Sequence, residues 1–179
     1  MLKNILLALA AIIAVLVIIV ALQPDTFQVT RNITIKAPPS TIFPQVNDLH
    51  QWTAWSPWER LDPALQRTYE GSPTGSGAIY RWNSAKNDVG QGAMTITDSR
   101  PSELVGIKLE FLKPFAATND VAFTFKPEGD ETLVTWTMNG KANFMCKAMN
   151  LVMNMDKMVG GDFEKGLTNL KSVTEAAPR

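Results

Sequence analysis

The sequence has little of what disulfide, metal or redox chemistry requires. Its 179 residues include one cysteine, Cys146, and one histidine, His50. A single cysteine cannot form an intrachain disulfide, and it excludes a zinc site built on a CxxC pair. Because free cysteines are among the most buried residue types, Cys146 is predicted to be a small hydrophobic core residue. We therefore expect no metal site and no cofactor.

The chain also lacks net charge. Lys and Arg together number 17, and Asp and Glu together number 17. A nucleic-acid-binding domain normally shows a basic excess or a basic stripe. The sequence shows neither, so nucleic acid is disfavoured as a partner.

Catalytic signatures are missing as well. The sequence contains no GxSxG or HExxH motif, and its Gly-rich stretch GSPTGSGA is followed by no predicted helix that could cradle a phosphate. His50 lies two residues from Asp48, a spacing at which helical side chains diverge, so a surface or capping role is predicted for it. Strand alternation points Arg81 and Glu110 to solvent. No catalytic residue is predicted.

What the chain does have is a long apolar run at its N-terminus. Ile5 to Leu22 are 18 consecutive apolar residues, which make about 27 Å of helix and match a bilayer core. Secretory signals have shorter apolar regions, of about 7–15 residues, and end in a small-residue cleavage site. Residues 1–24 are therefore predicted to be a retained transmembrane anchor with a short linker. A cleaved signal and a buried helix are the alternatives.

The side of the membrane follows from weaker signals. Lys3 precedes the apolar run and Asp25 follows it, which leaves the N-terminus in the cytoplasm. Arg31 and Lys36, beyond the other end, favour the opposite orientation. The predicted product is a single-pass protein with its domain, residues 25–179, on the periplasmic or extracytoplasmic side.

Residues 25–179 form roughly 150 residues, the usual size of one domain. Alternation with a period of two predicts a first strand, its apolar face beginning near Ile33 because Arg31 interrupts it. A short helix is predicted from its N-cap Ser40 to Leu49. After a Trp-rich stretch, short turns separate strand-like segments with one apolar face, the pattern of an antiparallel meander covered on one side. Four of these segments are especially clear: 92–97, 104–111, 121–126 and 134–138.

The cover is predicted in the last third of the chain. From Phe144 to Glu175 apolar residues recur at steps of three and four, which indicates a long helix. Gly160 and Gly161 interrupt it, so a kink or a split is expected there.

Five stretches resemble a known family: IKAPPSTIF, WTAWSPWERLDP, TYEGSPTGSGAIYRWN, TWTMNG and MVGGDFEKGLTNLKSVTE. Together they are similar to the polyketide cyclase/dehydrase-like branch of the START/Bet v 1 (SRPBCC) superfamily, from about Phe27 to Glu175. The resemblance implies an α+β helix-grip fold, with a curved antiparallel sheet, two short helices and a long C-terminal helix. It also implies a cavity between sheet and helix that holds lipids, polyketides or other apolar molecules.

Methionine usage agrees with such a cavity but does not require it. Met is flexible and polarizable, and suits irregular or varied contacts, yet a Met stripe at helical spacing more often packs a solid core. Five of the eight methionines lie in the helical region: Met145, Met149, Met153, Met155 and Met158.

The hypothesis that follows is a membrane-tethered binder of an apolar small molecule. Its predicted cavity lining is Tyr80, Trp82, Met94, Ile107, Leu109, Phe111, Phe123, Phe125, Trp136, Met138, Met149, Met153, Phe163 and Leu167. Its predicted rim is Trp52, Trp55 and Trp58. A cyclase or dehydratase using Arg81, Tyr80 or His50 as polar groups is one alternative. A protein-interaction module that exposes the three rim indoles is the other, with no partner indicated.

Overall fold

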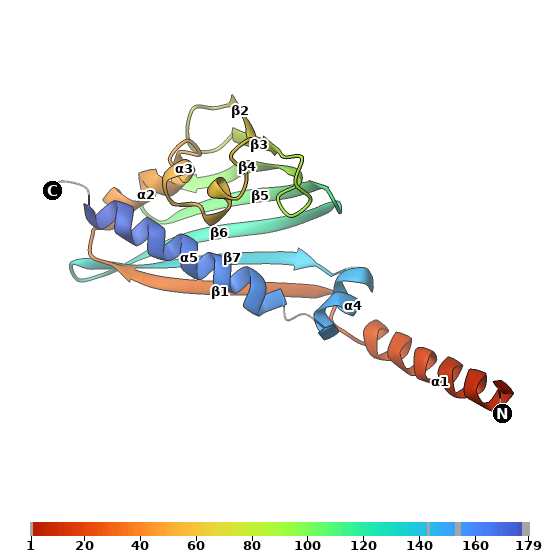
Figure 1. Ribbon diagram of the computed structural model, residues 1–179. Helices are drawn as coiled ribbons and strands as arrows, with labels where there is room; N and C mark the ends of the chain where they lie inside the picture. The colour runs from red at the N-terminus through yellow and green to blue at the C-terminus, as the bar shows by residue number, and fades with distance from the viewer. Residues whose placement is uncertain (1, 143, 153–154, 177–179) are drawn as a thin grey trace.

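The segments with alternating apolar residues form one sheet. Within residues 2–142, 144–152 and 155–176, which the computed structural model describes, seven antiparallel strands lie in the order β1-β7-β6-β5-β4-β3-β2 (Figure 1). Every sequential pair from β2 to β7 is adjacent, so the predicted meander is confirmed, and β1 closes the far side against β7. The strands are β1 (Thr26–Ile35), β2 (Gln66–Gly71), β3 (Ala78–Asn83), β4 (Gln91–Arg100), β5 (Leu104–Lys113), β6 (Ala117–Glu128) and β7 (Glu131–Lys141).

Helices cover one face of the sheet. The long helix α5 (Met155–Ala176) lies across it, which confirms the α+β helix-grip (Figure 1). The short helices α2 (Pro39–Asn47) and α3 (Trp52–Trp55) and the 3-10 turn η1 (Pro57–Arg60) fill the connection from β1 to β2. Helix α2 begins one residue before the predicted cap Ser40, with Pro38 at the N-cap position and no side-chain capping bond.

The predicted break at Gly160 and Gly161 is wrong. Helix α5 runs through both glycines, and α4 (Phe144–Val152) precedes it in the chain. The glycine at position 160 is explained by Arg31 of β1, which faces the helix at this point. A Cβ on Gly160 would lie 2.0 Å from Nη2 of Arg31, so glycine makes room for this guanidinium.

Arg31 thereby joins the buried side of β1 instead of interrupting it. Its guanidinium pairs with Asp156 at 3.0 Å and with Glu164 at 2.7 Å, one helical turn to either side of Gly160. Val29 is buried and Phe27 packs on the core, so the inward face starts at Phe27 and not near Ile33.

The glycines of α5 make a testable pair. Nothing lies within 4 Å of a Cβ on Gly161, so Gly161→Ala should raise the free energy of unfolding by about 0.5–1 kcal/mol through helix propensity. A Cβ on Gly166 would lie 2.8 Å from the Trp136 ring and 3.2 Å from Pro57, so Gly166→Ala should lower it by about 1–3 kcal/mol. Urea denaturation of residues 25–179 measures both. Equal effects of the two substitutions would contradict the close approach of α5 to Trp136.

Helix α1 (Leu2–Ala21) projects from the domain (Figure 1). Of its twenty residues only Val20 is buried, while large apolar side chains along its whole length are exposed. It is the one helix among the described residues that is long and apolar enough to cross a membrane. Its twenty residues span about 30 Å, the thickness of a hydrocarbon core.

Candidate functional site

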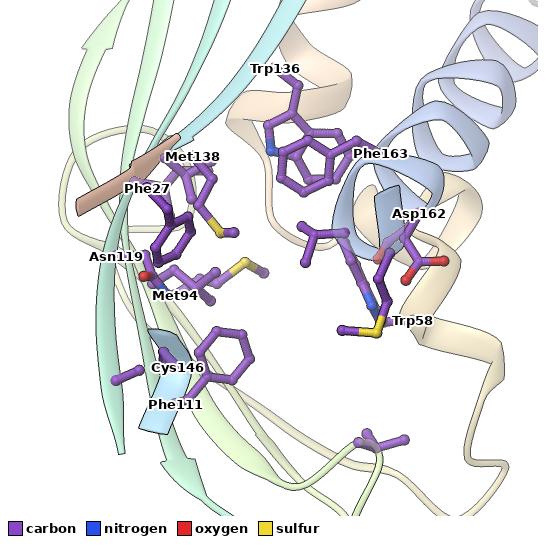
Figure 2. A pocket seen from close by; sticks show the side chains of 18 of the residues that line it. Phe27, Trp58, Met94, Phe111, Asn119, Trp136, Met138, Cys146, Asp162 and Phe163 are labelled. Carbon is purple, nitrogen blue, oxygen red and sulfur yellow. The ribbon is translucent and has the colours of Figure 1, made fainter. Parts of the chain in front are cut away.

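A cavity of about 630 Å³ lies between the sheet and its helical cover, within the usual range for small-molecule pockets. In Figure 2, Phe27, Met94, Phe111 and Met138 project into it from the sheet side, and Trp58 faces them from the other side. Trp136 and Phe163 stack at 4.0 Å between ring centres, joining β7 to α5. The lining is mostly apolar and aromatic, with few polar groups.

The hollow occupies one half of the sheet. In five neighbouring strands the lining residues are those nearer the end where β1 begins and β7 finishes, whereas inward residues further along are packed solid. The lining members include Tyr80 and Trp82 of β3, Met94 of β4, Ile107, Leu109 and Phe111 of β5, Asn119 and Val121 of β6, and Trp136 and Met138 of β7. Their solid counterparts are Ala78, Ile96, Val105, Phe125 and Val134.

The solid half is filled by aromatic rings from α2 and α3. Trp55 is fully buried and packs on Phe123 and Trp136 with ring centres 6.0 and 5.8 Å apart. Phe43 of α2 meets Phe125 edge-on at 5.8 Å. These rings occupy the space that the cavity would otherwise continue into.

Nine of the residues predicted to line a cavity do line it: Tyr80, Trp82, Met94, Ile107, Leu109, Phe111, Trp136, Met138 and Phe163. Four others lie elsewhere. Phe123, Phe125 and Leu167 are packed in the solid half, and Met149 is exposed on α4. Met153 lies outside the described residues.

The structure separates the three tryptophans that were predicted to form a rim. Trp52 and Trp58 line the cavity, whereas Trp55 lies in the core behind it. Trp52 and Trp55 are buried, and both indole N–H groups donate to backbone carbonyls of α2, those of Val46 and Gln45. Trp58 turns its ring toward Trp136 and Phe163. The segment therefore does not offer three exposed indoles to a protein partner.

Several lining residues were missed by sequence reasoning. Cys146 lines the cavity and does not sit in a core, and Gln23 and Pro24 reach it from the linker after α1. Asn119 lines it from β6 and is nearly fully buried. The strand alternation could have indicated Phe27 and Val121, but the linker and α4 contribute only through their position in three dimensions.

A polar cluster is set into the mostly apolar wall. The Tyr80 hydroxyl donates to Oε1 of Glu59 at 2.6 Å, and Nε of Arg67 donates to Oε2 at 2.7 Å. The Glu59 side chain is 7% exposed, and both Glu59 and Tyr80 line the cavity. Burial, and then the bond to Glu59, raise the pKa of Tyr80 far above its ordinary value.

Tyrosine ionisation tests this cluster. Tyr69 and Tyr80 are the two tyrosines of the chain, and burial is the main reason that the pKa of each is raised from 10.0. At pH 10.5 an ordinary tyrosine is about three-quarters ionised. The native protein should therefore show far less tyrosinate absorbance at 295 nm than the urea-unfolded protein at that pH.

The raised pKa values of the two tyrosines also make the free energy of unfolding depend on pH. Because the pKa values of Tyr69 and Tyr80 are raised in the folded protein, these tyrosines stabilise it fully below about pH 10. Their contribution to the free energy of unfolding is lost as the pH rises above that value. Full native ionisation of both tyrosines at pH 10.5 would contradict the buried cluster.

The other polar candidates lie away from the cavity. Arg81 pairs with Glu70 at 3.2 Å on the outer face of the sheet, as its alternation predicted. His50 is exposed, and its ring stacks on Tyr69 with centres 3.9 Å apart. Its Nδ1 lies 2.9 Å from Oδ1 of Asp48, so the expected divergence is wrong, because α2 has ended and these residues form a turn.

At the other end of the cavity, α4 is tied to the linker. Lys147 is nearly buried and donates to the exposed carboxylate of Asp25. This hydrogen bond and the ammonium charge hold the pKa of Asp25 below its usual value. The two residues join the segment that follows α1 to the wall of the cavity.

Solved structures share this architecture. Protein CV1439 from Chromobacterium violaceum matches with a TM-score of 0.60 and 14% identity, over 87% of this chain and all of that one. The Aha1 dimer from Colwellia psychrerythraea matches with a TM-score of 0.59 and 14% identity, over 84% and 97% of the two chains. The di-domain ARO/CYC protein BexL from the BE-7585A biosynthetic pathway gives 0.61 and 19%, over 90% of this chain and 54% of its own. At these identities the likeness establishes the helix-grip fold.

No curated protein shows a significant match to this sequence. The family model described as polyketide cyclase/dehydrase and lipid transport matches residues 26–175. The chain therefore belongs to the polyketide cyclase/dehydrase and lipid transport family, as its sequence motifs indicated.

Proposed function

We propose that this protein is a membrane-tethered domain that binds an apolar small molecule, such as a lipid or a polyketide-like compound, in the cavity between sheet and α5. The cavity itself carries the proposal. A hollow of about 630 Å³ walled by Met, Phe, Trp and Leu side chains gains free energy when an apolar ligand displaces water from it.

The lining suits a ligand of irregular or variable shape. Met94 and Met138 place flexible thioethers in the wall, and the aromatic rings of Trp58, Trp82 and Phe111 also line it. Such walls discriminate little among apolar shapes. Orientation would then come from the few polar groups, chiefly Tyr80 and Asn119.

The tether completes the proposal. Residues 1–24 anchor the chain through the apolar run of residues 5–22, and residues 25–179 form the binding domain. An apolar helix with nearly all its side chains exposed requires an apolar surrounding, which a bilayer supplies. The positive charge before the helix favours an extracytoplasmic domain.

Binding can be measured on residues 25–179 with the neutral apolar dye N-phenyl-1-naphthylamine. Because Trp58, Trp82 and Trp136 line the cavity, a bound dye should accept energy from tryptophan and gain fluorescence to saturation at one site. Displacement by apolar compounds then identifies the ligand class. A domain that gives no saturable signal would contradict a ligand-binding cavity.

The Tyr80–Glu59 pair favours a second candidate, a cyclase or dehydratase working in the same cavity. If its hydroxyl turns from Glu59 to a substrate oxygen, the neutral buried phenol of Tyr80 donates its hydrogen bond to that substrate instead. The ARO/CYC designation of BexL is consistent with such chemistry. Conversion of the native ligand that is lost in Tyr80→Phe while dye binding persists would establish an enzyme, and unchanged ligand would leave a binder.

A further inference from the structure

The described surface of the domain collects its exposed apolar side chains at one end. Strand register defines this end: Thr26 opposite Lys141 marks the entry of β1 and the exit of β7, and Phe111 opposite Ala117 marks the β5–β6 turn. We call this the anchor end, because α1 enters it and α4 leaves from it (Figure 1).

Helix α4 exposes apolar side chains and buries its charged one, the reverse of a helix on the surface of a soluble domain. Among its described side chains, Phe144, Met149 and Leu151 are exposed, whereas its charged residue, Lys147, is nearly buried against Asp25. A helix packed on a domain in water normally turns charge outward and large apolar groups inward. The arrangement fits an outer surrounding that is apolar.

At the same end of the sheet, the end of β5 and the β5–β6 turn also expose large apolar side chains. Leu112 is 58% exposed and Phe115 is 73% exposed, and neither contributes to the core. Outside α1, the described part of the chain has two further exposed large apolar residues near this end, Leu22 and Met158, and one other, Leu61 in the loop after η1. Exposed apolar residues gathered in one patch mark an interaction surface.

The cavity reaches the same end. Gln23 and Pro24 of the linker and Cys146 and Lys147 of α4 form part of its wall, and α1 contacts α4 directly. A surface that is continuous with a membrane-spanning helix has the bilayer as its nearest apolar partner.

We propose that the anchor end is seated in the lipid bilayer, with α4 and the β5–β6 turn inserted at the level of the headgroups. The inference rests on the proposed tether and adds the orientation of the domain. It places the cavity wall formed by α4 and the linker against the bilayer, so that an apolar ligand passes between lipid and cavity without crossing water. The opposite end, with the β6–β7 turn, faces away from the membrane.

The test uses the full chain in phosphatidylcholine vesicles whose acyl chains carry bromine, a contact quencher. In a Cys146→Ser background, bimane is attached at Phe115→Cys, Leu151→Cys or, as the matched control at the opposite end, Asp130→Cys. All three native side chains are exposed, so labelling disturbs no core contact. Bromolipid should quench the labels at positions 115 and 151 at least about threefold more strongly than the label at 130.

Vesicle flotation distinguishes a failure of the membrane tether from a failure of the seated orientation. If the protein floats with vesicles and the three labels are quenched alike, the seated orientation is overturned while the tether stands. If the protein fails to float, the tether and this inference fall together, and dye binding by residues 25–179 still reports on the cavity.

Discussion

Replacing Trp55 by alanine should lower the free energy of unfolding by about 3–5 kcal/mol, the cost of emptying a large buried aromatic site. Trp55 is fully buried, with its ring centre 4.5 Å from that of Trp52 and 6.0 Å from that of Phe123. Its Nε1 also donates to the Gln45 carbonyl at 3.0 Å, so truncation leaves that acceptor without its partner. Urea denaturation of residues 25–179 measures the loss.

Trp55→Phe is the matched control. It keeps an aromatic ring against Trp52 and Phe123 but removes the indole N–H, so it should cost clearly less than the alanine variant, on the order of 1–2 kcal/mol. A loss below about 1 kcal/mol for Trp55→Ala would show that the solid half does not depend on this ring.

Replacing Leu109 by tryptophan should block the cavity and weaken binding of the apolar dye by at least about tenfold, equivalent to about 1.4 kcal/mol. Leu109 lies in the middle of β5, pairs with Met94 of β4 and projects into the hollow half. An indole at this position would occupy the space a ligand needs, and the open cavity accommodates it without forcing a packed core apart. Dye fluorescence excited directly reads the effect independently of the added tryptophan.

Lys108→Trp provides the control on the same strand. Lys108 lies on the outer face, 45% exposed, and pairs with Glu110 at 2.7 Å. An exposed ion pair contributes little, so this variant should fold and bind dye as the parent does. Equal loss of binding in both variants would point to damage of β5 rather than occupation of the cavity.

Strand alternation was enough to predict the sheet, its meander order and, for strands β4 to β7, which side chains face the helices. It could not predict how far along each strand the interior is hollow. Phe125 and Leu109 both point inward, yet Phe125 meets Phe43 of α2 while Leu109 meets open space. The difference depends on where the short helices rest, which is a long-range property that no local pattern encodes.

The glycine pair of α5 shows the same limit. Gly160 was interpreted as a helix interruption because glycine is unfavourable in helices. Arg31, more than a hundred residues earlier, occupies the space beside it and pairs with Asp156 and Glu164. The charge of Arg31 likewise predicts a gap in the apolar face of β1, because its partners on α5 are far away in the sequence.

The most direct measurement is native mass spectrometry of the full chain, purified in mild detergent from its own host, compared with Leu109→Trp treated identically. The proposed function predicts that the parent protein carries an apolar molecule at one per chain, and that this added mass is reduced at least about tenfold in the variant. A parent protein that carries no small molecule, or one that Leu109→Trp retains in full, would contradict a ligand held between the sheet and α5.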